Sequence, residues 1–255
     1  MKILVVTSEV TFVPENYNQF LEGLFREMSG EKELFIELVI LRNNSFILPL
    51  KSFFLMLSGA RFIGFHLLKN SFKAFFKDRA SLAQKYNIPV HYFYNPNSSD
   101  FLLFVKNYQT DLIINARTRF IYKNSILKLP RLGAINIHHG LLPDYRGTMC
   151  DLWALHEERP TGFTIHVMEK KIDNGSIIRR VQTSTPDNPL YRKNFADLIF
   201  QSSKMEGIEM AQIIKSIRKN QSIPIEMNNI STSPTYTKNP DFFSIRKMLR
   251  KGIKL

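Results

Sequence analysis

Residues 134–147 read AINIHHGLLPDYRG, an apolar strand pattern that runs into a loop marked by glycine and proline. Asn136 and His138 lie two positions apart on the predicted strand, so their side chains point to the same face. In an open parallel sheet, ligands bind beyond the carboxyl ends of the strands. An amide donor and an imidazole at that place are suited to hold an oxygen that becomes negative during a reaction.

A second polar run, Asp173-Asn174-Gly175, lies in a predicted turn between two apolar strands at 161–168 and 176–182. Its carboxylate could orient the imidazole or accept a proton. Taken alone, this run is explained by an ordinary tight turn, and only its combination with the strand motif indicates a site. The same residues do not predict a metal centre, because adjacent histidines on a strand face opposite ways and a zinc site needs convergent ligands.

The rest of the chain predicts an α/β fold, with a mostly parallel, twisted sheet covered by helices on both faces. Apolar strand patterns alternate with helical patterns through the first half of the chain. The predicted strands lie at 2–7, 34–41, 89–94, 112–115 and 134–138, and the predicted helices lie at 15–28, 81–86 and 100–108.

Two parts are predicted along the 255 residues: a catalytic domain over 1–190 and a helical, basic C-terminal extension over 191–255. A long helix is predicted at 190–219 from its apolar periodicity. From residue 231 onward the chain is basic and interrupted by Pro234 and Pro240, which favours a segment that lies over the domain or reaches for a partner.

The order and spacing of three motifs resemble the folate-dependent formyltransferase family. The motifs are Asn-x-His at 136–138, Leu-Leu-Pro-x-Tyr-Arg-Gly at 141–147 and the Asp-x-Gly turn at 173–175, and the likeness covers roughly residues 111–180. The family includes methionyl-tRNA, glycinamide ribonucleotide and nucleotide-sugar N-formyltransferases. The resemblance implies a Rossmann-like formyltransferase fold, N10-formyltetrahydrofolate as co-substrate, no metal, and direct attack of an uncharged amine on the formyl carbon.

Carried over by position, the resemblance assigns a role to each motif residue. Asn136 would stabilise the oxyanion, His138 would be the catalytic histidine, and Asp173 would position that histidine and help to move protons. The backbone around two loops would form the folate pocket, and three further residues would contact the substrate. The pocket residues are Phe120, Ile121, Tyr122, Glu169 and Lys171, and the substrate-binding residues are His139, Gly140 and His166.

The acceptor predicted from the resemblance is a small amine, with an amino sugar linked to a nucleotide as the leading candidate. Residues 7–12 contain no glycine-rich phosphate loop, which disfavours glycinamide ribonucleotide. The stretch after residue 190 is shorter than the C-terminal barrel of the methionyl-tRNA branch. A methionyl-tRNA formyltransferase-like enzyme without that barrel, a formyltetrahydrofolate hydrolase and a non-catalytic binding protein remain open alternatives, as does a homodimer.

The charge of the chain favours anionic partners. There are 35 Lys and Arg against 22 Asp and Glu, a net charge of +13, which raises the local concentration of anions. Nucleotide-linked sugars, polyglutamylated folate, nucleic acid and acidic lipid all fit this charge, and a basic run at 246–254 leaves nucleic-acid binding open. One cysteine excludes an internal disulfide framework, and the N-terminus lacks the features of a signal peptide, so a cytoplasmic protein is predicted.

Residues 46–77 form a cluster of Phe and Leu interspersed with Lys and Arg. Two interpretations are open. The segment could be an amphipathic helix on a membrane surface, in which case an amine on a lipid-linked glycan becomes the natural acceptor. It could instead be a pair of core helices that cover the sheet, with lysines that reach out to solvent. Its longest uncharged central stretch, 52–60, is too short to span a bilayer.

Overall fold

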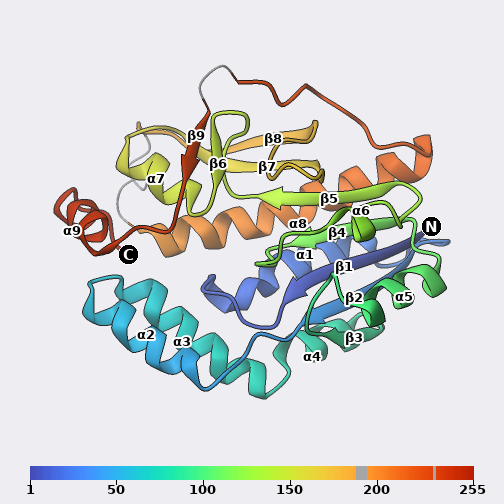
Figure 1. The fold of residues 1–255 in the computed structure, drawn as a ribbon, viewed down its shortest axis with the longest axis horizontal. Helices are drawn as coiled ribbons and strands as arrows, with labels where there is room; N and C mark the ends of the chain where they lie inside the picture. The colour runs from blue at the N-terminus through green and yellow to red at the C-terminus, as the bar shows by residue number, and fades with distance from the viewer. Residues whose placement is uncertain (188–193, 232–233) are drawn as a thin grey trace.

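A computed structural model describes residues 1–187, 194–231 and 234–255, and within these ranges a seven-stranded sheet forms the centre of the molecule (Figure 1). The first five strands in the order β3-β2-β1-β4-β5-β7-β8 are parallel, whereas β7 and β8 pair antiparallel at one edge. This confirms the predicted mostly parallel sheet. The strands are β1 Lys2–Ser8, β2 Phe35–Leu41, β3 Val90–Phe93, β4 Leu112–Ala116, β5 Gly133–His138, β7 Thr161–Val167 and β8 Ile177–Ser184.

Helices cover both faces of the sheet, as predicted. Successive side chains of a strand point to opposite faces, and in β1 they enter two different apolar clusters. Ile3 and Val5 pack in a cluster with α1 (Asn18–Met28) and α8 (Phe195–Asn220). Leu4 and Val6 pack on the other face with α5 (Ser99–Tyr108) and α6 (Asn124–Leu127). A strand that is buried on both faces therefore needs the continuous apolar run seen in the sequence.

The long helix α8 belongs to the core that covers the sheet. Ile199, Met210 and Ile214 are buried in the same cluster as the strand residues, and the helix packs along α1 through two glycines, Gly23 and Gly207. The predicted start of this helix at 190 and the predicted domain boundary at 190/191 lie outside the described residues, and the division into two parts stays a prediction.

The first helix begins later than predicted. The apolar periodicity indicated a helix from residue 15, but α1 starts at Asn18, after a 3₁₀ turn over Pro14–Tyr17. Glu15, Asn16 and Tyr17 adopt positive φ. The Asn16 side chain accepts from Thr11 N at 2.9 Å and donates to Glu9 O at 2.9 Å, so local polar contacts hold the turn against helical geometry.

Residues 46–77 form a helical hairpin, α2 (Ile47–Leu57) and α3 (Arg61–Phe75), which Figure 1 shows at the lower left, apart from the strands. The sequence analysis offered a pair of core helices that cover the sheet as one interpretation of this segment. The pair of helices is confirmed, but the predicted position over the sheet is wrong. The helices pack mainly on each other and beside the 3₁₀ turn and α4 (Asp78–Lys85), not across a face of the sheet. None of the described helices is long and apolar enough to cross a bilayer.

The C-terminal segment returns to the loop that follows β5. The short strand β9 (Thr235–Thr237) pairs in parallel with β6 (Tyr145–Gly147), and α9 (Phe242–Arg250) lies beyond it. The next helix after β6 in the sequence is α7 (Cys150–His156). The helix α9 was not predicted, because its basic composition hides a short apolar stripe, of which Ile245 and Met248 are buried.

Close packing of α1 on α8 predicts unequal effects of two glycine substitutions. A Cβ at position 207 would stand 2.5 Å from Phe20 O, so Gly207→Ala should destabilise the protein by about 1–3 kcal/mol. A Cβ at position 23 would meet nothing closer than 3.5 Å, so Gly23→Ala should be neutral or stabilise the helix. Urea unfolding of both variants tests this, and equal midpoints would contradict the packing described.

Candidate active site

Three polar side chains form a row across neighbouring strands at the carboxyl end of the sheet. In the strand register, Asn115 of β4 lies opposite Asn136 of β5, which lies opposite His166 of β7. Asn115 Nδ2 donates to Asn136 Oδ1 at 2.9 Å, and Asn136 Nδ2 lies 3.1 Å from His166 Nε2. The sheet register therefore brings the predicted Asn136 and His166 into direct contact and adds Asn115, which the sequence analysis did not assign.

Hydrogen bonds along this row fix the orientation of the Asn136 amide. The backbone N–H of Thr118 lies 3.3 Å from Asn115 Oδ1, and a backbone N–H can only donate. Asn115 Nδ2 must therefore face Asn136 Oδ1, which turns the Asn136 NH₂ group toward His166. His166 Nδ1 lies 2.8 Å from Val167 O, so that nitrogen carries the proton and Nε2 accepts. One N–H of Asn136 is used in this row, and the second meets no acceptor among the described residues.

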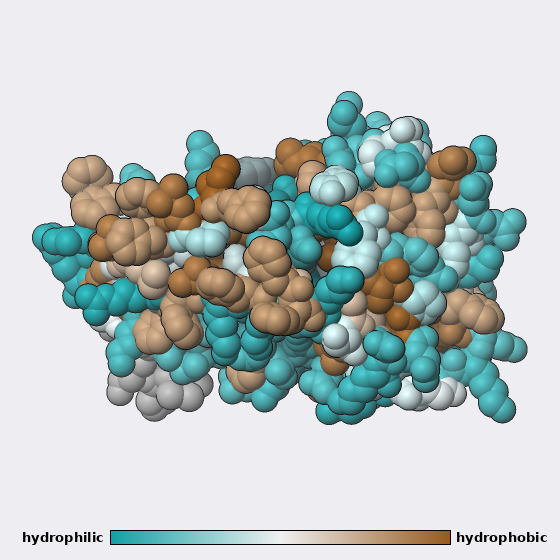
Figure 2. Space-filling view, turned by 90° about the horizontal axis from the view of Figure 1, so that it is seen from below, coloured by the Kyte–Doolittle hydropathy of each residue, from teal (hydrophilic) through white to brown (hydrophobic). Residues whose placement is uncertain are grey.

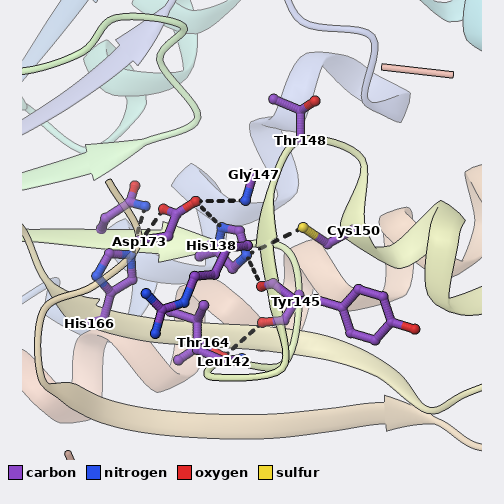
Figure 3. Close-up of polar contacts among 12 residues, drawn as sticks. His138, Leu142, Tyr145, Gly147, Thr148, Cys150, Thr164, His166 and Asp173 are labelled. Atoms are coloured by element: carbon purple, nitrogen blue, oxygen red, sulfur yellow. Dashed lines mark hydrogen bonds and ion pairs between the residues drawn. The ribbon is translucent and has the colours of Figure 1, made fainter. Parts of the chain in front are cut away.

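The His138 ring is placed between two acceptors (Figure 3). Its Nε2 lies 2.9 Å from the carbonyl oxygen of Tyr145, and its Nδ1 lies 3.5 Å from Asp173 Oδ2. An imidazole that faces acceptors on both nitrogens is best satisfied in its protonated form. Burial by itself would lower the pKa of His138, but the thiol of Cys150 and the carboxylate of Asp173 outweigh it and raise the pKa to about 10.

His166 has the opposite protonation behaviour. Burial, together with the positive charge of His138, lowers its pKa to about 4. The neutral ring agrees with its hydrogen bonds, in which one nitrogen donates and the other accepts. Two histidines whose ring centroids lie 6.2 Å apart are therefore held in different charge states by their surroundings.

Asp173 is brought to the site by the turn that follows β7. Its backbone has a φ of 50°, and its Oδ2 accepts from Gly147 N at 3.0 Å. Its other oxygen lies 3.7 Å from His166 Nε2. Figure 3 shows this carboxylate between the two imidazoles and the Gly147 N–H. The three residues predicted as the reactive centre, from two distant parts of the chain, thus converge.

Arg146 of the Leu-Leu-Pro-x-Tyr-Arg-Gly motif holds the turn that carries Asp173 in place through hydrogen bonds. Its buried guanidinium donates to Asn174 Oδ1 at 2.6 Å and to Asn229 O at 3.1 Å. Asn229 Nδ2 in turn donates to the carbonyls of Asp173 and Gly175, both at 3.0 Å. The position of the carboxylate therefore depends on a residue from the C-terminal part of the chain.

His139 points away from these residues, because successive side chains at the strand end alternate between faces. Its Nδ1 contacts Arg117 and lies 3.3 Å from Glu206 Oε1, inside a buried polar cluster with Tyr17 and Asp151. Burial lowers the pKa of His139 well below its ordinary value and raises the pKa of Glu206 to about 7. The structure does not bring His139 together with Asp173, and its predicted substrate contact stays a prediction.

Gly140 allows the close packing of the site. A Cβ at this position would stand 2.9 Å from His138 Nε2 and 2.6 Å from Cys150 Cβ, so a side chain there would displace the imidazole. The carbonyl of Gly140 accepts from Thr164 Oγ1 at 2.7 Å, and the same hydroxyl accepts from Leu142 N at 3.0 Å. These contacts fix the chain as it leaves β5.

The predicted folate-pocket segments lie on the α5 and α6 face of the sheet. Phe120, Tyr122 and Met168 join one apolar cluster there, with Tyr122 buried. Asn97 Nδ2 donates to Ile121 O at 2.9 Å and so fixes the first segment. Glu169 and Lys171, in the second segment, are exposed. Both segments follow strand ends next to β5, and their role in folate binding stays a prediction.

A hollow of about 490 Å³ lies at the opposite edge of the sheet and does not belong to this site. It is lined by Lys2, Phe35, Asp111 and Arg131, among others, at the amino ends of β1 and β4. Ligands of parallel sheets bind at the carboxyl ends, where the polar row lies. Among the described residues no group of three or more His, Cys, Asp or Glu could hold a metal ion.

Comparison with known proteins shows which family the candidate site resembles. Residues 77–187, which contain the polar row, His138 and Asp173, match the model of the family described as "Formyl transferase". The matched stretch, 111 of the 255 residues, is similar to this family. The N-terminal residues and α8 lie outside the matched range, and the fold joins them to the matched stretch through the common sheet and core.

Individual relatives agree with this assignment. A stretch of 92 residues is 36% identical to GDP-perosamine N-formyltransferase of Brucella melitensis biotype 1, covering 36% of this chain and 36% of that protein. A stretch of 111 residues is 35% identical to methionyl-tRNA formyltransferase of Protochlamydia amoebophila, covering 43% of this chain and 35% of the relative. The match thus spans about a third of the length of these curated relatives.

The fold is also similar to that of a solved structure, a sugar N-formyltransferase from Shewanella sp FDAARGOS_354. The TM-score is 0.61 over 93% of this chain and 76% of that one. The sequences are 15% identical, so this likeness concerns the fold alone. It agrees with the predicted Rossmann-like formyltransferase fold.

Two residues of the site, Asn115 and Asn229, were missed by sequence reasoning. Asn115 had a usable signal, because it is a polar residue inside the otherwise apolar strand LIINA, one place before the carboxyl end. Asn229 had none, since it lies in a loop far from the motifs and reaches the turn only through tertiary folding. Arg146 stood in the recognised motif, but its partners could not be derived from spacing.

The opposite charge states of the two histidines predict distinct titrations. In an NMR titration, the His138 ring should keep its proton until the pH approaches 10, while His166 should stay neutral above about pH 4. Because the pKa of folded His138 lies above its ordinary 6.5, its protonation stabilises the fold fully below pH 6.5 and is lost as the pH rises through about 10.

Asp173→Asn provides the matched control for this titration, because it removes a charge that favours imidazolium while it keeps the shape. The His138 midpoint should fall in this variant. A wild-type midpoint at or below 6.5, or no response to Asp173→Asn, would contradict the electrostatic arrangement described.

Proposed function

We propose that this protein is an N-formyltransferase that transfers a formyl group from N10-formyltetrahydrofolate to a primary amine of a small, anionic substrate. The observation that carries the proposal is the convergence of an oriented amide, a cationic imidazole and a carboxylate beside the carboxyl ends of β4 and β5. The match of residues 77–187 to the formyltransferase family model supports the same conclusion.

The residues of the site fit a carbonyl oxygen that gains negative charge. Asn136 offers its second N–H in a fixed direction, and it does not need to reorient as the charge develops. The imidazolium of His138 and the guanidinium of Arg146 make the surroundings positive, which favours an oxyanion. N10-formyltetrahydrofolate, when bound, supplies the activated formyl group.

Proton movement is assigned to Asp173 and His138. Asp173 Oδ1 lies 3.7 Å from His166 Nε2, which carries no proton, so this carboxylate oxygen can accept a proton from the amine as it attacks the formyl carbon. His138 lies 3.5 Å from the other oxygen and carries a proton that it can donate at Nδ1. Gly147 N–H holds the carboxylate in place during both events.

For the acceptor we propose an amino sugar linked to a nucleotide. The net charge of +13 favours a diphosphate-bearing substrate, and one of the relatives is named GDP-perosamine N-formyltransferase. His166 supports this assignment only as a neutral hydrogen-bonding group, since burial and the charge of His138 keep its pKa low. Gly140 and His139 are proposed to shape the acceptor side through packing, not through charge.

A screen of acceptors tests the function. The purified protein is incubated with N10-formyltetrahydrofolate and separate amines: a nucleotide-linked amino sugar, methionyl-tRNA and glycinamide ribonucleotide. Mass spectrometry should show the gain of one formyl unit on the amino sugar. Consumption of the folate at the same rate without any acceptor would identify a hydrolase, and formylation of methionyl-tRNA alone would replace the proposed acceptor.

Two asparagine variants test the oxyanion role. Asn136→Ala removes the oriented donor and should lower kcat by about a hundredfold. Asn115→Leu leaves Asn136 in place but frees its amide to rotate, so kcat should fall by about tenfold, with little change of KM.

Urea unfolding separates this positioning role of Asn115 from a merely structural one. A drop in kcat with an unchanged unfolding midpoint supports the role. If Asn115→Leu loses stability but keeps its kcat, the row of hydrogen bonds does not orient the Asn136 amide for the reaction.

A further inference from the structure

The hairpin of α2 and α3 turns an apolar face to solvent. On α2, large apolar side chains are exposed at Ile47, Leu50, Phe53, Phe54 and Leu57, with exposed fractions of 53–66%. On α3 the exposed side chains are Phe62, Phe65, Phe72 and Phe75, and Phe76 directly follows the helix. We call these ten residues the apolar face. Figure 2 shows hydrophobic side chains gathered on the left half of the view from below, where the hairpin lies in Figure 1.

The apolar face cannot be buried by a rotation of the hairpin, because the opposite side is already anchored. Leu48 and Leu67 pack with Val10 in an apolar cluster of their own. Asn70 Nδ2 donates to Thr11 O at 2.8 Å and to Val13 O at 2.6 Å, which fixes the orientation of α3. The exposed stripes are therefore the outer side of a docked hairpin. Contiguous apolar surface of this kind marks an interaction site.

The charged side chains of residues 46–77 are all positive. Residues 46–77 contain no Asp or Glu. Lys51, Arg61 and Lys77 are exposed at its borders, whereas Lys69 and Lys73 pair with Glu15. A partner that covers this face must therefore bind Phe and Leu side chains and accept cations at the rim.

The basic C-terminal helix extends this surface. Phe62 N donates to Leu255 O at 2.6 Å, and the Leu249 side chain lies against Gly59, so α9 and the C-terminus adjoin the turn between α2 and α3. On α9, Phe242 and Phe243 are exposed, with Arg246 and Lys247 exposed beside them. The same combination of aromatic and cationic side chains is thus repeated on a second helix.

The hairpin lies at the same edge of the sheet as the candidate active site. It packs on Val10, directly beyond the carboxyl end of β1, and the polar row lies at the carboxyl ends of β4 and β5. A surface that covers the apolar face would therefore lie beside this edge.

We propose that the apolar face docks on the surface of an anionic lipid bilayer. In the interfacial region, apolar side chains enter the acyl boundary while lysines and arginines reach the headgroups. A second copy of the chain fits less well, because a twofold contact would bring Lys51 and Arg61 of both copies together with no carboxylate in the segment to pair with. This docking is independent of the proposed formyl transfer.

Vesicle sedimentation of the full-length protein tests the docking, with phosphatidylcholine vesicles prepared with and without phosphatidylglycerol. The protein should bind the anionic vesicles at low salt and bind them more weakly at high salt, because salt screens the contribution of the cations. Phe54→Ser/Phe75→Ser should lower the affinity at least about tenfold, since each buried aromatic side chain is worth more than a factor of ten.

Two further variants keep the test specific. Phe35→Ser removes a phenylalanine of matching exposure, 59%, on β2, and should bind the vesicles as the wild type does. Lys51→Glu/Arg61→Glu leaves the apolar face intact and should weaken binding to anionic vesicles alone. Circular dichroism confirms that each variant is folded before it is compared.

Three results would overturn the proposal. The first is no binding to anionic vesicles at low salt. The second is equal binding by Phe54→Ser/Phe75→Ser and the wild type. The third is a dimer, detected by light scattering in the absence of lipid, that the double variant dissociates, which would assign the apolar face to a contact between copies. None of these measurements uses a formyl donor. A negative result would therefore reject the membrane docking without bearing on the proposed formyl transfer.

Discussion

The register between β4, β5 and β7 is the constraint on which the candidate site depends. It aligns Asn115, Asn136 and His166 in one row, and a shift by one residue would turn each side chain to the opposite face. Both neighbours of β5 are needed, because the Asn136 amide is held on one side by a donor and on the other by an acceptor. The Asn136 amide therefore gains its orientation from a hydrogen-bond chain that begins at a backbone N–H.

The carboxylate reaches this row through a separate set of contacts. Arg146, Asn174 and Asn229 hold the turn that carries Asp173, and β9 lies against the strand that carries Arg146. The buried guanidinium donates to the neutral oxygens of Asn174 and Asn229 and so places a positive charge near the site. These contacts hold the turn that carries the carboxylate.

The two adjacent histidines illustrate how one strand end supports two different environments. His138 faces the carboxylate and is stabilised as a cation, whereas His139 enters the buried cluster under α1 and α8 and is stabilised as a neutral ring. In that cluster Asp151 and Glu206 have a raised pKa because burial disfavours their charge, to about 6 and about 7 respectively. Identical side chains one residue apart therefore differ in charge because the strand alternates between two faces.

The sequence alone predicted the mostly parallel sheet, the positions of most of its strands along the chain, and Asn136, His138 and Asp173 as candidate site residues, because local periodicity and motif spacing are properties of neighbouring residues. It also fixed the composition of the hairpin, with its phenylalanines and cations. Tertiary structure alone decided that Asn115 and Asn229 belong to the site, that His139 turns away from it, and that the hairpin lies beside the sheet with its apolar face outward. Those outcomes depend on contacts between residues that are far apart in the chain. The geometry of such contacts follows from strand register and packing, and local sequence patterns do not reveal it.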